Sequence, residues 1–297
     1  TSQAAISSLM LIGKKDKIAA DKAAVDSMRK ELNKIDMNGR IVIGEGELDK
    51  APMLYIGENL GTKKGPYLDI AVDPLEGTNF AANNLPGALS VIAIAEKNNL
   101  FNAPETYMNK IAINKNEKGI VDLDFDIKKN IKNLADSLNK DISDITACIL
   151  DRPRHKNLID ELKNLKVRLK LITDGDVSGA LLVSDKKYGI DIFLGIGGGP
   201  EGVLAASALD TYGCFFQGRF IFDNDENIKR AKLMGIKDLK RKYELNDIIT
   251  GDSIFCATGI TTGDLVKGVS KKGDKFITET LVTHKSTKLN KILIKED

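Results

Sequence analysis

The segment at residues 69–78, Asp-Ile-Ala-Val-Asp-Pro-Leu-Glu-Gly-Thr, restricts the possible folds of this chain more than any other. Its apolar run at 70–72 is typical of a buried strand, and Pro74 should end that strand because proline cannot donate a ladder hydrogen bond. Gly77 permits a sharp turn just afterwards. We therefore expect two carboxylates and a hydroxyl to crowd the end of one strand: Asp73, Glu76 and Thr78.

A second apolar run, at residues 40–43, also leads directly into acids, with Gly-Glu-Gly-Glu-Leu-Asp at 44–49. If the two strands are neighbours, five carboxylates converge: Glu45, Glu47, Asp49, Asp73 and Glu76. Crowded carboxylates repel one another unless a cation lies among them. Ligands that offer only oxygen suit Mg²⁺ or Mn²⁺. The pattern predicts a divalent-cation site; the alternative, a turn with solvated acids, would have to arise twice.

The composition excludes several classes of protein. A chain of 297 residues with 42% hydrophobic residues can bury a sizeable core and is long enough for two lobes. It has no long apolar run, so we expect no membrane span, and a net charge of +2 does not favour nucleic acid. Its cysteines, Cys148, Cys214 and Cys256, show no zinc-ligand spacing. With no signal-peptide pattern at 1–14, these features predict a reduced, cytoplasmic protein.

Hydrophobic periodicity predicts the elements of the first half. A helix is expected at 17–35, because Ala24, Met28, Leu32 and Ile35 share one face. Apolar runs predict strands at 40–44, 67–73 and 88–95, with a further strand at 108–114 that would pair beside the last of these. A second amphipathic helix is expected at 126–139.

Strands and helices alternate after about residue 140, which favours a parallel sheet. The expected order is strand 145–150, helix 156–165, strand 167–172, helix 177–183, strand 190–196 and helix 202–209. A buried strand at 253–257 and an alternating tail from 267 follow. This change of rhythm predicts two packed lobes, a metal-binding α+β lobe at 1–140 and an α/β lobe at 141–297.

Ligands of open α/β sheets bind beyond the carboxyl ends of the strands, and polar residues follow three strands of the second lobe. The first strand is followed by the cationic Asp-Arg-Pro-Arg-His-Lys at 151–156, where paired arginines suit phosphate. Asp-Gly-Asp at 174–176 could accept sugar hydroxyls, although Asp176 could equally be a helix N-cap. Gly-Gly-Gly-Pro-Glu-Gly at 197–202 forms an expected anion-binding loop and adds Glu201 as a further metal ligand.

An acidic, metal-binding half and a half suited to phosphate and polyol together favour metal-assisted hydrolysis of a sugar phosphate. A kinase is less favoured, because neither a Walker loop nor a dinucleotide loop is present. The alternatives are an inositol phosphatase, a sedoheptulose bisphosphatase and a non-catalytic sensor of sugar phosphates. A sensor could lose Thr78, Asp49 or a metal ligand without penalty, and the chain keeps all of them.

The chain resembles the class II fructose-1,6-bisphosphatases of the lithium-sensitive sugar-phosphatase superfamily. The similar segments run through nearly the whole chain in the family's order: Asp-Lys-Ile-Ala-Ala-Asp (16–21), Val-Ile-Gly-Glu-Gly-Glu-Leu-Asp (42–49), Ala-Pro-Met-Leu-Tyr-Ile-Gly-Glu (51–58), Val-Asp-Pro-Leu-Glu-Gly-Thr (72–78), Asn-Ala-Pro-Glu-Thr-Tyr-Met (102–108), Pro-Arg-His (153–155), Asp-Gly-Asp (174–176), Ile-Gly-Gly-Gly-Pro-Glu-Gly (196–202) and Ala-Thr-Gly-Ile-Thr (257–261). The chain departs from the family in the residues after Thr78 and in a shorter 219–235 stretch.

The resemblance implies a layered α-β-α-β-α fold, a homodimer or homotetramer, and gluconeogenic hydrolysis of fructose 1,6-bisphosphate, a phosphoric monoester, with Mn²⁺ or Mg²⁺. The metal ligands it implies are Asp21, Glu45, Asp73, Glu76 and Glu201. The substrate contacts are Glu76, Gly77, Thr78, Tyr107, Arg152, Pro153, Arg154, Asp174, Gly175, Asp176 and Gly198. Lys17 matches a basic position near the phosphate to be cleaved. Thr78 is expected to orient the attacking water, with Asp49 or Glu47 as the base.

Overall fold

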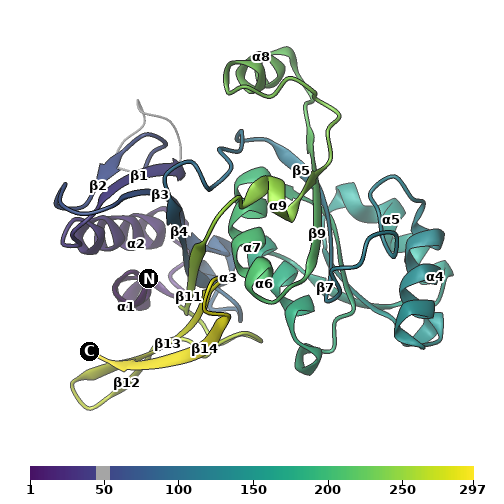
Figure 1. The fold of residues 1–297 in the computed structure, drawn as a ribbon. Helices are drawn as coiled ribbons and strands as arrows, with labels where there is room; N and C mark the ends of the chain where they lie inside the picture. Colours follow the sequence, from purple (N-terminus) through teal and green to yellow (C-terminus); the bar gives the residue numbers. More distant parts are fainter. Residues whose placement is uncertain (45–53) are drawn as a thin grey trace. The chain divides into compact units, whose positions relative to one another are not determined.

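The structure, a computed structural model, describes residues 1–44 and 54–297 (Figure 1). It divides into two compact units, one of Thr1–Ala103 with Ile248–Asp297 and one of Pro104–Asp247. These units are not the consecutive lobes expected to meet at residue 140. The difference arises because the C-terminal strands pair with the first sheet, whereas the strand expected at 108–114 belongs to the second sheet. Each unit is described below by itself.

The first unit is built on an eight-stranded sheet. Its strands are β1 (Asn38–Ile43), β2 (Asn59–Leu60), β3 (Tyr67–Glu76), β4 (Leu89–Glu96), β11 (Ser253–Gly259), β12 (Ser270–Lys272), β13 (Lys275–His284) and β14 (Leu289–Glu296). The order is β12-β13-β11-β4-β3-β1-β2, and β14 pairs with β13. β1 and β3 are parallel, as expected for neighbours that end together, and the remaining pairs are antiparallel.

Helices α1 (Ser2–Ser8), α2 (Lys17–Leu32) and α3 (Thr78–Ala82) belong to this unit, with a 3-10 turn η1 (Leu9–Leu11) between the first two. The Asp16 carboxylate caps α2 by accepting from the Ala19 N–H at 2.9 Å. Ala24 and Met28 bury the apolar face of α2 in the same core as strand residue Ile70. The helix ends at Leu32, earlier than expected, and Ile35 is 47% exposed, because the turn-forming residues at 33–36 follow.

The second unit contains a six-stranded sheet in the order β10-β9-β5-β8-β6-β7. Its strands are β5 (Tyr107–Ile113), β6 (Thr146–Leu150), β7 (Arg168–Ile172), β8 (Ile192–Gly198), β9 (Phe215–Ile221) and β10 (Tyr243–Glu244). The predicted parallel arrangement holds for β6 with β7 and β8. The expectation that β5 pairs beside β4 was wrong, because β5 lies antiparallel between β8 and β9.

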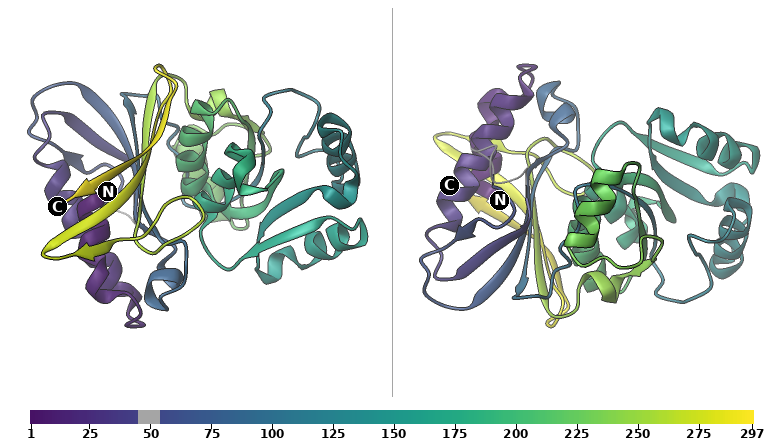
Figure 2. Two further views of the ribbon diagram at one scale, coloured as in Figure 1. Left: turned by 90° about the horizontal axis from the view of Figure 1, so that it is seen from below. Right: turned by 90° about the horizontal axis from the view of Figure 1, so that it is seen from above.

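Helices cover both faces of this second sheet (Figure 2). They are α4 (Ile127–Leu138), α5 (Lys156–Asn164), α6 (Asp176–Leu181) and α7 (Gly199–Thr211). The unit also contains α8 (Asp225–Leu233), which projects beyond the end of β9, the short α9 (Leu245–Ile248), and the 3-10 turns η2 (Ile142–Asp144), η3 (Pro153–His155), η4 (Leu182–Ser184) and η5 (Lys186–Tyr188). Ile131 of α4 and Leu162 of α5 share a core with Ile111 of β5. α6 and α7 pack together on the opposite face. The two helix-covered sheets confirm the predicted layered α/β class.

None of the helices among the described residues is long and apolar enough to cross a membrane.

Candidate active site

The carboxyl end of β3 carries the acidic residues of the first unit. Glu76 is 3% exposed and Asp73 is half-buried. The expectation that Pro74 ends the strand was wrong, because β3 continues to Glu76. The pairing of β3 with β4 shifts register between Asp73 and Glu76, and a bulge of this kind tolerates a proline that lacks an N–H. The bulge thus holds both carboxylates at one strand end.

Gly77 turns the chain from β3 into α3. Its φ of +78° is left-handed, and an added Cβ would stand 2.8 Å from the Phe80 ring. Thr78 is therefore the first residue of α3 and is half-buried. The sharp turn inferred from the sequence is confirmed, and it places a hydroxyl directly after the buried Glu76 carboxylate.

The first turns of α2 contribute two further predicted residues. Lys17 is the first residue of the helix and is exposed, and Asp21 lies four positions later, on the same side of the helix, and is half-buried. α2 packs against both β3 and α3. Lys17 and Asp21 thus belong to the same compact unit as Asp73 and Glu76.

Three predicted residues, Glu45, Glu47 and Asp49, lie outside the described residues. Within 1–44 and 54–297, no group of three or more His, Cys, Asp or Glu side chains is arranged to hold a metal ion. The proposed ligand Glu201 belongs to the second unit. The cation site stays a prediction whose donor set is distributed over several segments.

In the second unit, the loop after β6 presents the predicted arginines. Arg154 donates from Nε to the Ile196 carbonyl at 2.9 Å, and its guanidinium carbon lies 4.8 Å from the centre of the Tyr107 ring. Arg152 pairs with Asp174 at 3.4 Å. The ends of β5, β6, β7 and β8 therefore converge. They bring together four predicted residues that span 67 positions of the sequence: Tyr107, Arg152, Arg154 and Asp174.

His155 connects this loop to the end of β8. The buried ring accepts the Ile196 N–H at Nε2 (2.7 Å) and contacts the Leu150 carbonyl through Nδ1 at 2.7 Å. Nε2 must lack a proton to accept, so Nδ1 carries the proton and the ring is neutral. Burial lowers the pKa of His155, and the hydrogen bond to Leu150 opposes that shift. These contacts give His155 a structural role in the loop after β6.

The glycine-rich segment differs from the expected loop. β8 extends to Gly198, and α7 begins at Gly199, so these glycines form a direct strand-to-helix junction with Pro200 in the first turn. A Cβ on Gly198 would stand 1.8 Å from Glu201 Oε2, so a larger residue there would displace the Glu201 carboxylate. Burial raises the pKa of the Glu201 carboxyl, and the positive charge of Lys110 opposes this effect.

Lys110 was not predicted as part of the site. It lies on β5, is 1% exposed, and forms an ion pair with Asp176. Asp176 is 9% exposed at the first position of α6, directly after Gly175, whose φ of +82° is left-handed. The sequence did contain a signal, because a lysine in the middle of the apolar strand expected at 108–114 must either face solvent or have a partner.

An open pocket of about 330 Å³ in the second unit links several of these residues. Its lining includes the predicted Tyr107, Gly198 and Glu201, together with Glu105, Thr106, Pro200, Asp223 and Asn227. Glu105 and Thr106 fall within the quoted segment 102–108. Asp223 and Asn227 were not expected, because they come from the α8 region, where the sequence offered no recognised motif.

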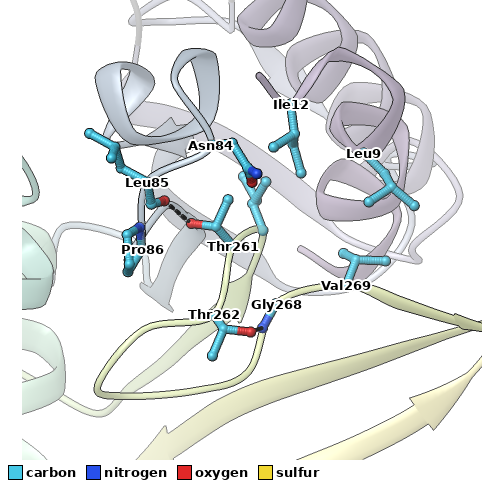
Figure 3. Close-up of a pocket in the computed structure, with 10 residues that line it drawn as sticks. Leu9, Ile12, Asn84, Leu85, Pro86, Thr261, Thr262, Gly268 and Val269 are labelled. Atoms are coloured by element: carbon cyan, nitrogen blue, oxygen red, sulfur yellow. Dashed lines mark hydrogen bonds between the residues drawn. The ribbon is translucent and has the colours of Figure 1, made fainter. Parts of the chain in front are cut away.

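A second pocket, of about 490 Å³, lies in the first unit (Figure 3). None of the predicted site residues lines it; its walls come from η1, the turn at 84–86 and the segment 260–269. The Thr261 hydroxyl donates to the Leu85 carbonyl at 2.8 Å and accepts the Ala88 N–H at 2.9 Å. Thr261 therefore stabilises the turn that follows α3, and α3 is the helix that begins at Thr78.

Comparison with known proteins identifies the family to which the chain belongs. The family model described as bacterial fructose-1,6-bisphosphatase, glpX-encoded, matches residues 1–296. A D-fructose 1,6-bisphosphatase class 2/sedoheptulose 1,7-bisphosphatase of Prochlorococcus marinus (strain NATL1A) is 45% identical over 294 residues, covering 94% of this chain and 88% of the relative. A fructose-1,6-bisphosphatase class 2 of Haemophilus influenzae is 42% identical over 307 residues, covering 98% and 92%. The chain therefore belongs to the bacterial, glpX-encoded fructose-1,6-bisphosphatase family.

Proposed function

We propose that this chain hydrolyses fructose 1,6-bisphosphate to fructose 6-phosphate and inorganic phosphate. The main support is the sheet edge of the second unit, where Arg154 and Tyr107 meet beside the Arg152–Asp174 pair, in a chain that matches the family over residues 1–296. Guanidinium groups suit phosphate oxygens, and carboxylates suit sugar hydroxyls. Both relatives are named as fructose-1,6-bisphosphatases of class 2.

In this proposal the second unit holds the part of the substrate that does not react. Arg152 and Arg154 bind the phosphate that remains on the sugar, and the Tyr107 hydroxyl donates to the same phosphate. Tyr107 is 46% exposed, so its hydroxyl is accessible to a ligand. Asp174 and Asp176 accept hydrogen bonds from sugar hydroxyls, while Pro153, Gly175 and Gly198 shape the backbone around them.

The carboxylates fit a divalent cation, Mn²⁺ or Mg²⁺. All the proposed ligands offer oxygen only, as hard cations prefer: Asp21, Glu45, Asp73, Glu76 and Glu201. Glu76 is 3% exposed at the end of an apolar strand, where an ionised carboxylate is costly unless positive charge compensates it. When bound, the cation supplies charge neutralisation at the phosphate and acidifies water.

The chain's own residues would carry the remaining steps. The Thr78 hydroxyl orients the attacking water, and Asp49 or Glu47 takes up a proton during the attack. The water oxygen bonds to phosphorus as the bond between phosphorus and the sugar oxygen breaks, and the sugar oxygen takes a proton from solvent as it leaves. Lys17, exposed at the start of α2, stabilises the phosphate that departs.

We also propose a homodimer or homotetramer that acts in the cytoplasm. The absence of a zinc-type or disulfide-type cysteine pattern supports a reducing compartment; Cys148 and Cys214 are buried as free thiols. Sedimentation of the purified chain would determine the oligomer.

The test is phosphate release by the purified protein from fructose 1,6-bisphosphate with Mn²⁺, Mg²⁺ or EDTA. Inositol 1-phosphate and sedoheptulose 1,7-bisphosphate serve as parallel substrates. Release should be greatest from the fructose substrate, disappear with EDTA and return with excess cation. Release from inositol 1-phosphate alone would overturn the substrate assignment. A folded protein that binds fructose 6-phosphate but releases nothing would instead be a sensor.

A further inference from the structure

Lys110 carries a charge inside the second unit, where charge is expensive. Its side chain is 1% exposed, and it extends from the middle of β5. Burying an ammonium group costs several kcal/mol unless partners compensate it closely. A methionine would fill a similar volume without that desolvation cost. The charge of Lys110 therefore needs an explanation other than packing.

We propose that Lys110 is a positioning residue for sugar recognition: it holds Asp176 and the Gly198 carbonyl so that the second carboxylate oxygen of Asp176 faces a substrate hydroxyl. This inference rests on the proposed function and adds a residue to it.

Glycines make the space for this lysine. Lys110 is paired across the sheet with Gly195 on β8 and Gly218 on β9, so neither neighbour places a side chain beside it. On the helix above, an added Cβ at Gly202 would stand 3.5 Å from Lys110 Cδ. The stem therefore passes between β5 and the first turn of α7 and reaches the end of β8.

Two acceptors hold the ammonium group at that end. Nζ donates to the Gly198 carbonyl at 2.6 Å and forms a short ion pair with Asp176 Oδ2. One cation thus joins the strand-to-helix junction of β8 and α7 to the start of α6. These are two backbone segments that the proposed function assigns to the substrate.

The same contacts fix the direction of the Asp176 carboxylate. Oδ2 is engaged by Lys110, and a Cβ on Gly197 would stand 1.9 Å from it, so the Gly197 backbone also lies close to this oxygen. Oδ1 is buried and has no hydrogen-bond partner among the described residues. A buried carboxylate oxygen of this kind is costly unless a donor reaches it, and a sugar hydroxyl is a donor of suitable size. Lys110 selects which oxygen is presented.

A role confined to stability is the competing explanation, and kinetics separates the two. Lys110→Met removes the charge and keeps most of the volume. If Lys110 positions Asp176, KM for fructose 1,6-bisphosphate should rise about tenfold or more, because one hydrogen bond to a charged acceptor is lost. The turnover number should stay within about threefold, since the contact is equal in the ground and transition states. A purely structural role would lower the melting temperature and leave KM unchanged.

The double variant Lys110→Met/Asp176→Asn shows whether a rise in KM comes from lost positioning or from misfolding. It removes both members of the buried pair, so its melting temperature should recover relative to Lys110→Met alone. Its KM should match that of Asp176→Asn within about threefold, because both substitutions act through one contact. Lys118→Met is the matched control, because Lys118 lies in the same unit and is 81% exposed. The KM of this variant should equal the wild-type value.

Two results would overturn the proposal. One is a folded Lys110→Met protein with wild-type KM. The other is a double variant whose KM is either normal or the product of the two single effects. Wild-type turnover, measured first, tests the proposed function separately. If the wild type does not hydrolyse the substrate, the affinity for fructose 6-phosphate, measured by calorimetry, replaces KM in every comparison. The same differences between wild type, single variants and double variant then decide the role of Lys110.

Discussion

At the scale of single residues, His155 shows how a neutral side chain maintains the loop after β6 that carries Arg152 and Arg154. Its two ring nitrogens join the end of β6, at the Leu150 carbonyl, to the end of β8, at the Ile196 N–H. The Ile196 carbonyl in turn accepts from Arg154. A Cβ at Gly195 would stand 3.0 Å from the ring, so the glycine allows this close approach. Protonation of Nε2 would abolish its acceptor role and loosen the connection on which Arg154 depends.

This arrangement predicts a pH dependence of stability. The unfolded chain should protonate His155 near the usual pKa of 6.5, whereas burial lowers the folded-state pKa. The stabilising contribution is complete above about pH 6.5. Between that pH and the lowered folded-state pKa only the unfolded state takes up the proton. The free energy of unfolding should therefore fall as the pH drops through this window, by at most about 1.4 kcal/mol per pH unit.

Urea unfolding of wild type and His155→Gln at several pH values measures this effect. Glutamine offers a donor and an acceptor without titrating, so the variant should lose the component of the slope below pH 6.5 that His155 causes. The control is His284→Gln, which removes the other histidine and should keep that component. Equal slopes in wild type and His155→Gln would contradict a neutral, buried imidazole.

Sequence patterns pointed to residues whose chemistry is unusual at their position. Arginines after a strand and acids at a strand end were recognised because such groups need a partner or a ligand. Lys110 was missed because its partner, Asp176, is 66 positions away, and strand pairing rather than local pattern brings them together. Asp223 and Asn227 were missed because the region of α8 carries no recognised motif.

At the scale of elements, the turn after α3 depends on one hydroxyl. Thr261 is 8% exposed, and its hydroxyl donates to the Leu85 carbonyl (Figure 3) and accepts the Ala88 N–H. Thr261→Val keeps the shape and leaves both backbone groups without that partner. The free energy of unfolding should fall by about 1–3 kcal/mol. Urea or thermal unfolding measures the loss.

Thr262→Val is the matched control for that substitution. Thr262 is exposed, and its hydroxyl accepts only the Gly268 N–H among the described contacts. The change in stability should stay within about 0.5 kcal/mol, as for ordinary surface substitutions. Equal losses in the two variants would show that the buried bridge at Thr261 contributes nothing of its own.

Most elements were predictable, whereas their junctions were not. Periodicity correctly indicated α2, α4 and the strands β6, β7 and β8. The strand β3 runs through Pro74 because a bulge accommodates it, and a bulge depends on the partner strand. The glycines at 197–199 join β8 directly to α7, because close approach by Asp176 and Glu201 requires glycine there. In both cases, contacts with segments distant in the sequence determine where the strand ends, and the local sequence does not.

At the scale of the whole molecule, each of the two units has a hydrophobic core of its own among the residues that the structure describes. Ile41, Ile70 and Val72 belong to one, and Ile111, Ile149 and Ile192 belong to the other. The C-terminal strands return to the first sheet, where β11 pairs with β4. A division at residue 140 was expected from the change in rhythm along the sequence, but sheet membership depends on pairing between distant strands. The second unit is therefore the only one of the two that is a single continuous segment.

This organisation predicts that Pro104–Asp247 folds when produced alone, because it has its own sheet and its own core. The fragment should unfold cooperatively in urea and bind fructose 6-phosphate, since Arg152, Arg154 and Tyr107 are all within it. It should release no phosphate from fructose 1,6-bisphosphate, because Thr78 and most proposed metal ligands belong to the other unit. Circular dichroism, calorimetry and a phosphate assay measure the three properties.

The fragment carrying Arg154→Ala provides the control for binding. Arg154 is exposed, so its loss should leave cooperative unfolding intact while weakening fructose 6-phosphate affinity. Binding that is unaffected by this change would show that the sugar phosphate is held elsewhere in the unit. Phosphate release by the isolated fragment would contradict the division of labour altogether, since it would show that hydrolysis needs neither Thr78 nor the acidic end of β3. A fragment without cooperative unfolding would instead show that the second core depends on the first for its stability.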